Sequence, residues 1–181
     1  MTHTIFIKML TALAILCAAA VQAERAEITL SAPLDADLDA YCLDIRGSKQ
    51  NADVSSGLQT HTCYAYQGQM GIDQMFDTAR LNDKTLYMPE FDVCATLASF
   101  DAGSAVSLTT CNASEAQSIA LTDQGHLSPT AAPAMCLTAG HETRLGRGGT
   151  SKHQIKSLTL EACSDDLAPY QQWAPRFAPG K

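Results

Sequence analysis

The chain has 181 residues, a formal net charge of −7 and seven cysteines. This length is enough for one domain with a substantial hydrophobic core, and nothing in the sequence argues for a second. The acidic balance disfavours nucleic acids and anionic membrane surfaces as partners.

The first 23 residues have the features of a secretory signal. Lys8 precedes an apolar run over residues 9–21, and the small-residue end at 21–23 suits cleavage. The run is too short to span a bilayer, and a leucine precedes Cys17 where a lipobox needs a small residue. We expect a secreted or periplasmic protein without stable membrane insertion. Removing Lys8 with the leader leaves 11 basic and 19 acidic residues, a formal charge of −8.

Residues 24–38 are expected to form an N-terminal lead-in with one strand-like piece at 27–30. Alternating acids at 35–39 mimic the start of a calcium loop. However, Ala40 stands where that loop needs glycine, and Arg46 where it needs a bidentate glutamate. We therefore expect a solvated segment and no metal site.

From Tyr41 onward one pattern occurs three times: a cysteine, a later cysteine, then a Gln-x-hydrophobe triplet. The copies are Cys42, Cys63 and Gln74-Met75-Phe76; Cys94, Cys111 and Gln117-Ser118-Ile119; and Cys136, Cys163 and Gln171-Gln172-Trp173. A period of roughly forty to fifty residues indicates a repeat architecture. We expect one domain over residues 39–178, with repeats at about 39–86, 87–128 and 129–178.

Six cysteines in an exported chain without a CxxC pattern favour disulfides over a metal site. Fifteen pairings are possible, and the repeat favours one bridge per copy: Cys42–Cys63, Cys94–Cys111 and Cys136–Cys163. Each bridge would close a loop of roughly 20 residues, worth about 3 kcal/mol in the chain-entropy model.

Short apolar pieces separated by turn residues, without a sustained helical period, predict an all-β chain. The candidate strands are 27–30, 41–45, 59–64, 75–78, 85–88, 105–110, 118–122, 126–128, 135–138, 157–162 and 172–175. Asp123-Gln124-Gly125 has the chemistry of a hairpin turn. At most one helical turn is expected at 72–80 and at 112–118.

The glutamine of each triplet has a structural use that needs no ligand. A buried amide can satisfy loop backbone groups that no strand ladder reaches. The hydrophobe two residues later points to the same face of a strand and would fill the core, which assigns Phe76, Ile119 and Trp173 to a shared core. Three such units would close around one axis as a threefold β domain.

These features resemble the ricin B-type (R-type) β-trefoil lectins. The resemblance rests on the opening at 42–47, the three cysteine pairs and the three QxW-like triplets, of which the one ending in Trp173 keeps the usual tryptophan. It covers about residues 39–176. It implies a β-trefoil whose repeats each have a shallow pocket for a sugar, usually galactose or a relative.

Carried over residue by residue, the resemblance places one sugar site in the first repeat. Asp44 would accept hydrogen bonds from sugar hydroxyls, and His61 would be the stacking ring. Gln59 would add amide contacts, while Gln74 would mainly orient the loop. Asp73 stands where the family usually has asparagine, and an ionised aspartate only accepts hydrogen bonds, which predicts weakened binding of neutral galactose.

The other two repeats lack the aspartate and the ring, so their pockets are not expected to bind. Their residues at the same places are Thr96, Ser107, Thr109, Ala116 and Gln117, and Thr138, Thr159, Glu161, Tyr170 and Gln171. Tyr64 and Tyr66, just after the second cysteine, are candidate walls of the first pocket.

Other functions fit less well. Asp44 and Asp73 could form the acid and base of a glycosidase, but no nucleophile motif or catalytic domain accompanies them, and we expect neither an enzyme nor a cofactor. The alternative is a β-trefoil scaffold for protein–protein interaction, such as an inhibitor or assembly factor. The basic, Gly-rich segment 144–156 is expected to be mainly a solvated insertion. Its minority interpretation is a contact for an anionic glycan or lipid headgroup.

Overall fold

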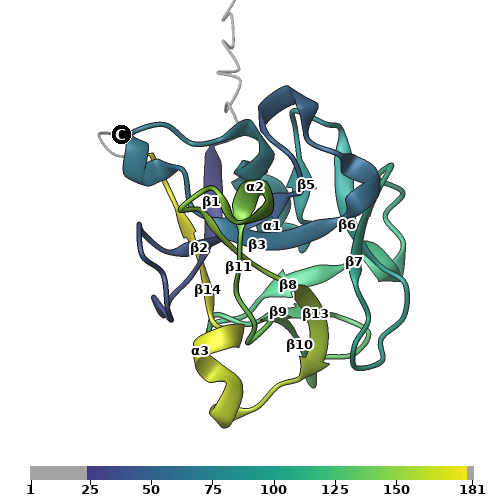
Figure 1. Ribbon diagram of the computed structural model, residues 1–181. Helices are drawn as coiled ribbons and strands as arrows, with labels where there is room; N and C mark the ends of the chain where they lie inside the picture. The colour runs from purple at the N-terminus through teal and green to yellow at the C-terminus, as the bar shows by residue number, and fades with distance from the viewer. Residues whose placement is uncertain (1–23, 179–181) are drawn as a thin grey trace, which may run out of the picture.

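The computed structural model describes residues 24–178 and consists mainly of short strands (Figure 1). The signal expected at 1–23 lies outside the described residues. None of the helices in this part of the chain is long and apolar enough to cross a bilayer.

The strands are β1 (Arg25–Leu30), β2 (Tyr41–Ile45), β3 (Leu58–Thr62), β4 (Phe76–Asp77), β5 (Tyr87–Met88), β6 (Val93–Leu97), β7 (Val106–Thr109), β8 (Ile119–Leu121), β9 (Leu127–Pro129), β10 (Met135–Ala139), β11 (Arg144–Leu145), β12 (Gln154–Lys156), β13 (Leu158–Ala162) and β14 (Trp173–Arg176). The helices are η1 (Lys49–Asn51), η2 (Val54–Ser56), η3 (Ala65–Gln67), η4 (Ile72–Gln74), α1 (Thr78–Asn82), η5 (Glu115–Gln117), α2 (Gly146–Gly149), η6 (Asp165–Leu167) and α3 (Ala168–Gln171).

Three antiparallel pairs, β2–β3, β6–β7 and β10–β13, define the three repeats. Each repeat has its first cysteine in the first strand of the pair and its second cysteine just after the second strand. The disulfides are Cys42–Cys63, Cys94–Cys111 and Cys136–Cys163, with Cα–Cα distances of 5.0, 5.1 and 5.1 Å. The predicted pairing of one bridge per repeat is therefore confirmed.

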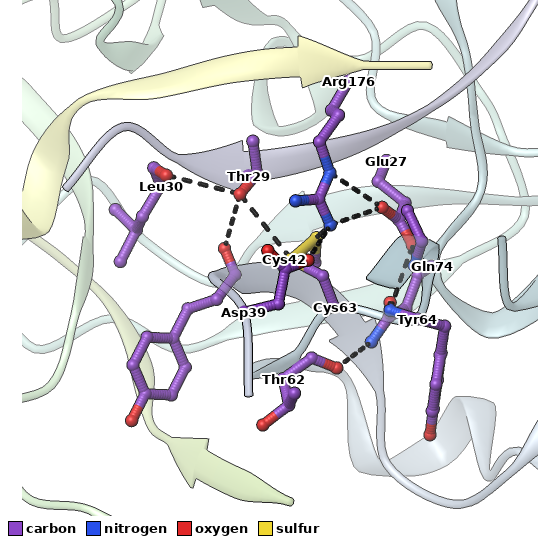
Figure 2. Close-up of a disulfide and its surroundings, with 12 residues drawn as sticks. Glu27, Thr29, Leu30, Asp39, Cys42, Thr62, Cys63, Tyr64, Gln74 and Arg176 are labelled. Carbon is purple, nitrogen blue, oxygen red and sulfur yellow. Dashed lines mark hydrogen bonds and ion pairs between the residues drawn. A yellow bond between two sulfur atoms is a disulfide. The ribbon is translucent and has the colours of Figure 1, made fainter. Parts of the chain in front are cut away.

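A glutamine side chain spans the second cysteine of the first repeat (Figure 2). The Gln74 amide oxygen accepts from the backbone N–H of Tyr64 at 2.9 Å. Its amide nitrogen donates to the carbonyl of Thr62 at 3.1 Å and to the Asp44 carboxylate at 3.0 Å. We call this arrangement the glutamine clamp. It satisfies the backbone groups on both sides of Cys63, as a buried amide was predicted to do.

The same clamp recurs in the other two repeats. The glutamine again accepts from the residue after the second cysteine, and donates both to the residue before it and to the side chain two positions after the first cysteine. Gln117 accepts from Asn112 at 2.8 Å and donates to Thr110 and Thr96, both at 3.0 Å. Gln171 accepts from Ser164 at 3.0 Å and donates to Ala162 and Thr138, both at 2.9 Å.

The hydrophobe of each triplet lies in one shared core. Phe76 and Ile119 are fully buried and Trp173 is 1% exposed, as expected. The Trp173 indole N–H donates to the backbone carbonyl of Leu137 at 2.9 Å, so its polar atom is also satisfied. The fold is thus an all-β β-trefoil of three pseudo-repeats around a common core.

Strand β1 joins the two ends of the domain. It pairs with β14 over four residues and also with β2 and β4. Its buried Glu27 accepts from the backbone N–H groups of Tyr64 and Ala65 and forms an ion pair with Arg176 at 2.9 Å (Figure 2). Burial raises the pKa of Glu27, against the opposing effect of Arg176. This contact holds β1 and the end of β14 against the first disulfide.

The structure adds three strands, β6, β11 and β12, where the sequence predicted none. Residues 144–156 were expected to be mainly a solvated insertion. This is wrong for β12, because Gln154, Ile155 and Lys156 are all buried. Strand β12 pairs with β3 of the first repeat, and the buried ammonium of Lys156 forms a 3.0 Å ion pair with Asp35. We call residues 144–156 the third-repeat insertion. It lies over the first repeat in Figure 1.

We expect Gln171→Leu to lower the free energy of unfolding by about 1–3 kcal/mol, because it leaves the partners of the third clamp unpaired. The neighbouring Gln172 makes none of these side-chain contacts, so Gln172→Leu should change stability by less than about 0.5 kcal/mol. Urea unfolding of both variants measures this difference. Equal stability of the two variants would show that the clamp does not stabilise the fold.

Candidate functional site

A pocket of about 530 Å³ opens between the first repeat and the third-repeat insertion. The first repeat lines it with Arg46, Gly47, Ser48, Gln59, His61 and Tyr64. The insertion lines it with Arg144, Gly146, Arg147, Gly148, Ser151, His153 and Ile155. Two segments far apart in the sequence therefore form one site.

Strand pairing places the two halves of the pocket together. Gln59 and His61 are two positions apart on β3, so their side chains point to the same face of the strand. Ile155 of β12 lies opposite His61, and Arg144 of β11 lies opposite Ile155. The insertion thus pairs with the edge of β3 that does not pair with β2, and there it forms the wall of the pocket.

A chain of polar contacts connects the insertion to the buried interior. Arg144 Nη2 donates to Gln59 Oε1 at 2.8 Å, and Gln59 Nε2 donates to Asp44 Oδ1 at 2.9 Å. The other Asp44 oxygen accepts from Gln74 of the clamp. The Gln59 amide is therefore fixed in orientation, with its oxygen toward the cationic wall and its nitrogen toward Asp44.

Asp44 lies beneath the pocket and does not line it. Its side chain is 1% exposed and is covered by Gln59. Burial raises the pKa of Asp44 well above its ordinary value, although its hydrogen bonds with Gln59 and Gln74 oppose the shift. A ligand in the pocket therefore reaches Asp44 only through Gln59, unless the Gln59 side chain turns aside.

His61 is held neutral at the floor of the pocket. Its Nδ1 lies 2.8 Å from the carbonyl of Thr62, and a carbonyl only accepts, so Nδ1 carries the proton. Burial lowers the pKa of His61 to about 4; the bond to Thr62 opposes the shift, and the charges of His153 and Arg144 add to it.

Aromatic rings form one wall of the pocket. The centroid of the His61 ring lies 5.1 Å from that of His153 and 5.3 Å from that of Tyr64. Tyr66 does not line the pocket, but its hydroxyl lies 3.1 Å from His153 Nε2. Gly71 makes room for this wall, because a Cβ at that position would collide with the Tyr64 ring.

Asp73 supports the loop at the pocket entrance. One carboxylate oxygen accepts from the backbone N–H of Lys49 at 3.0 Å, next to the lining residue Ser48. The other oxygen is buried without a hydrogen-bond partner within residues 24–178, and burial raises the pKa of Asp73. Asp73 does not line the pocket.

The structure brings the five predicted site residues together but divides them into two sets. Gln59 and His61 line the pocket, whereas Asp44, Asp73 and Gln74 lie behind that surface. The sequence reasoning did not place the insertion here, and so missed its lining residues in this site. Two signals pointed to the insertion: its basic, Gly-rich composition, and the spacing of the cysteines of the third repeat, which are 27 positions apart against 21 and 17 in the others.

The corresponding side chains of the other repeats satisfy each other. The hydroxyls of Thr96 and Thr109 lie 2.8 Å apart, and both accept from Gln117. In the third repeat the Thr159 hydroxyl donates to Glu161 at 2.9 Å. At the positions of Gln59 and His61 these repeats have Ser107 and Thr109, and Thr159 and Glu161, so they have no amide and no ring there.

Two groups of residues have the spacing of metal ligands. They are His126 with Cys136 and Cys163, and Glu27 with Cys42 and Cys63. All four cysteines are in disulfides, so neither group offers a thiolate. We assign a metal to neither.

No protein-family model matches the chain, and no curated protein matches it in sequence. Solved structures do match. They include an agglutinin from Abrus precatorius, with 17% identity, a TM-score of 0.57 and coverage of 86% of this chain and 49% of the other. Another is a non-toxic homologue of type II RIPs from Momordica charantia, in complex with α-methyl-D-galactoside. It has 18% identity and a TM-score of 0.55, and the match covers 86% of this chain and 48% of the other.

A third match is the β-trefoil lectin of the Vibrio vulnificus hemolysin/cytolysin with N-acetyl-D-lactosamine bound. It has 16% identity and a TM-score of 0.50, and covers 88% of this chain and 98% of the other. The chain spans about half the length of the first two proteins and nearly all of the third. At these identities the likeness concerns the fold, and it confirms the β-trefoil.

Proposed function

We propose that this protein is a secreted carbohydrate-binding protein whose sugar site is the pocket between the first repeat and the third-repeat insertion. The proposed ligand is galactose or a related sugar. The observation that carries the proposal is that Gln59 and His61, two positions singled out by the resemblance to the ricin B-type lectins, line one pocket beside Tyr64.

The structural neighbours support this class of ligand. One of them is in complex with a methyl galactoside and another holds N-acetyl-D-lactosamine. Both share the fold of this chain at low sequence identity, so the ligand is transferred here as a hypothesis. The pocket gives it local support.

The chemistry of the pocket suits a sugar. A sugar has an apolar ring face, which packs on flat side chains, and His61 and Tyr64 are such side chains. Its hydroxyls both donate and accept, and Ser48, Ser151 and the Gln59 amide oxygen line or face the same space. A shallow site of this kind corresponds to a dissociation constant near millimolar, roughly −4 kcal/mol.

Asp44 acts in this proposal as a positioning residue. The resemblance implies direct hydrogen bonds from its carboxylate to sugar hydroxyls, which the covering Gln59 amide prevents in this arrangement. Through its bond to Gln59 the carboxylate fixes which amide atom faces the pocket. A direct contact would require Gln59 to rotate when the sugar binds.

The proposal includes no catalysis. A glycosidase needs two carboxyl groups flanking the scissile bond, whereas Asp44 and Asp73 are both buried and lie on the same side, behind the pocket surface. Secretion is proposed on other grounds, namely the signal-like first 23 residues and the three disulfides, which form in oxidising compartments.

We expect His61→Ala to weaken galactose binding by about tenfold or more, about 1.4 kcal/mol, because it removes the ring at the pocket floor. The control is His141→Ala, since His141 is exposed and does not line the pocket. A glycan array followed by calorimetric titration measures the effect, in variants that keep the wild-type melting temperature. If the wild type binds no glycan, the protein-interaction scaffold becomes the better hypothesis.

We expect His61 to titrate near pH 4 by NMR, as the Nδ1–H tautomer, so that its ring stays neutral from pH 5.5 to 8. The unfolded chain takes up this proton near pH 6.5 and the folded one only near pH 4, so stability falls as the pH drops through this window. The loss is at most about 3 kcal/mol.

The variant His61→Gln should lose this part of the pH dependence, so the difference between wild type and variant isolates it from the other titrating groups. Chemical unfolding between pH 4 and 7 measures it. Parallel stability profiles for the two proteins would contradict the assignment.

A further inference from the structure

Cationic side chains gather around the pocket. Arg46, Arg144 and Arg147 all line it, and no aspartate or glutamate does. Within residues 24–178 none of the three takes part in an ion pair, although the chain has more acidic than basic residues. Three arginines around one pocket, none of them in an ion pair, indicate an anionic ligand.

Two of these arginines act on the pocket in identifiable ways. Arg144 is oriented by its hydrogen bond to Gln59 and uses only one of its nitrogens there, which leaves other N–H donors for a ligand. Arg147 lies in the left-handed backbone region, with φ of 51°, and precedes Gly148 and Gly149. Its charge acts on His153, whose pKa is lowered mainly by burial and further by Arg147.

The acidic groups near the pocket do not cancel this charge at its surface. Asp44 and Asp73 lie behind the floor, and burial raises the pKa of both. The ionised carboxylate of Asp53, which accepts from Ser55 and Ser56, interacts with Arg46 and offsets part of its charge. The inference therefore depends mainly on Arg144 and Arg147, which line the pocket without an acidic neighbour in the lining.

The strands that flank this wall are anchored to the rest of the domain. Strand β12 pairs with β3, and the Lys156–Asp35 ion pair ties the end of the insertion to the lead-in. Lys156 also donates to the Thr143 hydroxyl at 2.6 Å. With its hydrogen bond to Gln59, Arg144 is thereby preorganised, and a preorganised donor loses little entropy on binding.

We propose that the ligand is an acidic sugar, whose carboxylate or sulfate is bound by Arg144 and Arg147 while its ring packs against His61 and Tyr64. This inference rests on the proposed carbohydrate-binding function and narrows it. A guanidinium binds a carboxylate or sulfate through two parallel hydrogen bonds, whereas the hydroxyls of a neutral sugar leave its charge uncompensated.

The test compares sugars that differ only in the group at C6, which is neutral in one and anionic in the others. D-galacturonate carries a carboxylate where D-galactose has a hydroxymethyl group, and D-galactose 6-sulfate carries a sulfate there. In calorimetric titrations of the purified, oxidised protein at about 50 mM NaCl, we expect both acidic sugars to bind at least tenfold more tightly than galactose. Raising the salt to about 0.5 M should reduce this preference several-fold, since the Debye length shortens.

Matched variants locate the effect. Arg147→Gln should remove most of the preference, measured within that variant as the ratio of the galactose dissociation constant to the galacturonate one, and Arg144→Gln should weaken all sugars because it also releases Gln59. The control is Lys152→Gln, which makes the same charge change at an exposed position of the insertion outside the pocket. All three sites lie on the surface, and unchanged melting temperatures show that each variant is folded.

The outcomes separate this inference from the function on which it rests. Equal binding of galactose and galacturonate would overturn the acidic-sugar inference and leave the lectin proposal standing. Binding of none of the sugars would overturn both. Co-sedimentation with phosphatidylglycerol vesicles, lost in Arg147→Gln, without binding of galacturonate would assign the arginines to a lipid surface and overturn the inference as well.

Discussion

The whole fold depends on how three buried glutamine amides satisfy the backbone around the second cysteine of each repeat. At that point the chain leaves its strand, so the carbonyl before the cysteine and the N–H after it have no partner in a sheet. A side-chain amide both donates and accepts within one rigid plane. Ionised glutamate lacks the donor, and methionine lacks the donor and is only a weak acceptor, so neither can replace the glutamine, whereas the last residue of the triplet varies among Phe76, Ile119 and Trp173.

The third contact of the clamp shows where function departs from structure. Thr96 and Thr138 accept from their glutamines in the second and third repeats, so a neutral hydroxyl is enough for the fold. In the first repeat the same place holds Asp44, whose burial is unfavourable unless hydrogen bonds compensate. Its second oxygen is used by Gln59, which continues to Arg144. The carboxylate therefore has a role that the clamp does not require.

The sequence predicted what depends on local pattern and repetition. The cysteine register gave the disulfides, the triplets gave the core residues, and the resemblance named Gln59 and His61, which both line the pocket. The sequence did not predict that β12 would pair with β3. That contact joins segments more than ninety positions apart, and it does not recur in the other repeats, so no repeated pattern indicates it. Asp44 and Asp73 are buried by contacts within the first repeat, Asp44 with Gln59 and Gln74 and Asp73 with the backbone of Lys49.

If the pocket is the proposed sugar site, the residues that stabilise the protein are separate from those that select its ligand. The clamps, disulfides and β1–β14 closure lie within the threefold plan and need no insertion. The insertion adds only to the face of the first repeat, where it supplies Arg144, Arg147 and His153. A β-trefoil brings its first and third repeats side by side. A longer hairpin in the third repeat is therefore enough to form one wall of the pocket in the first repeat. Ligand chemistry can then change with the residues of one loop while the three glutamine clamps keep the scaffold the same.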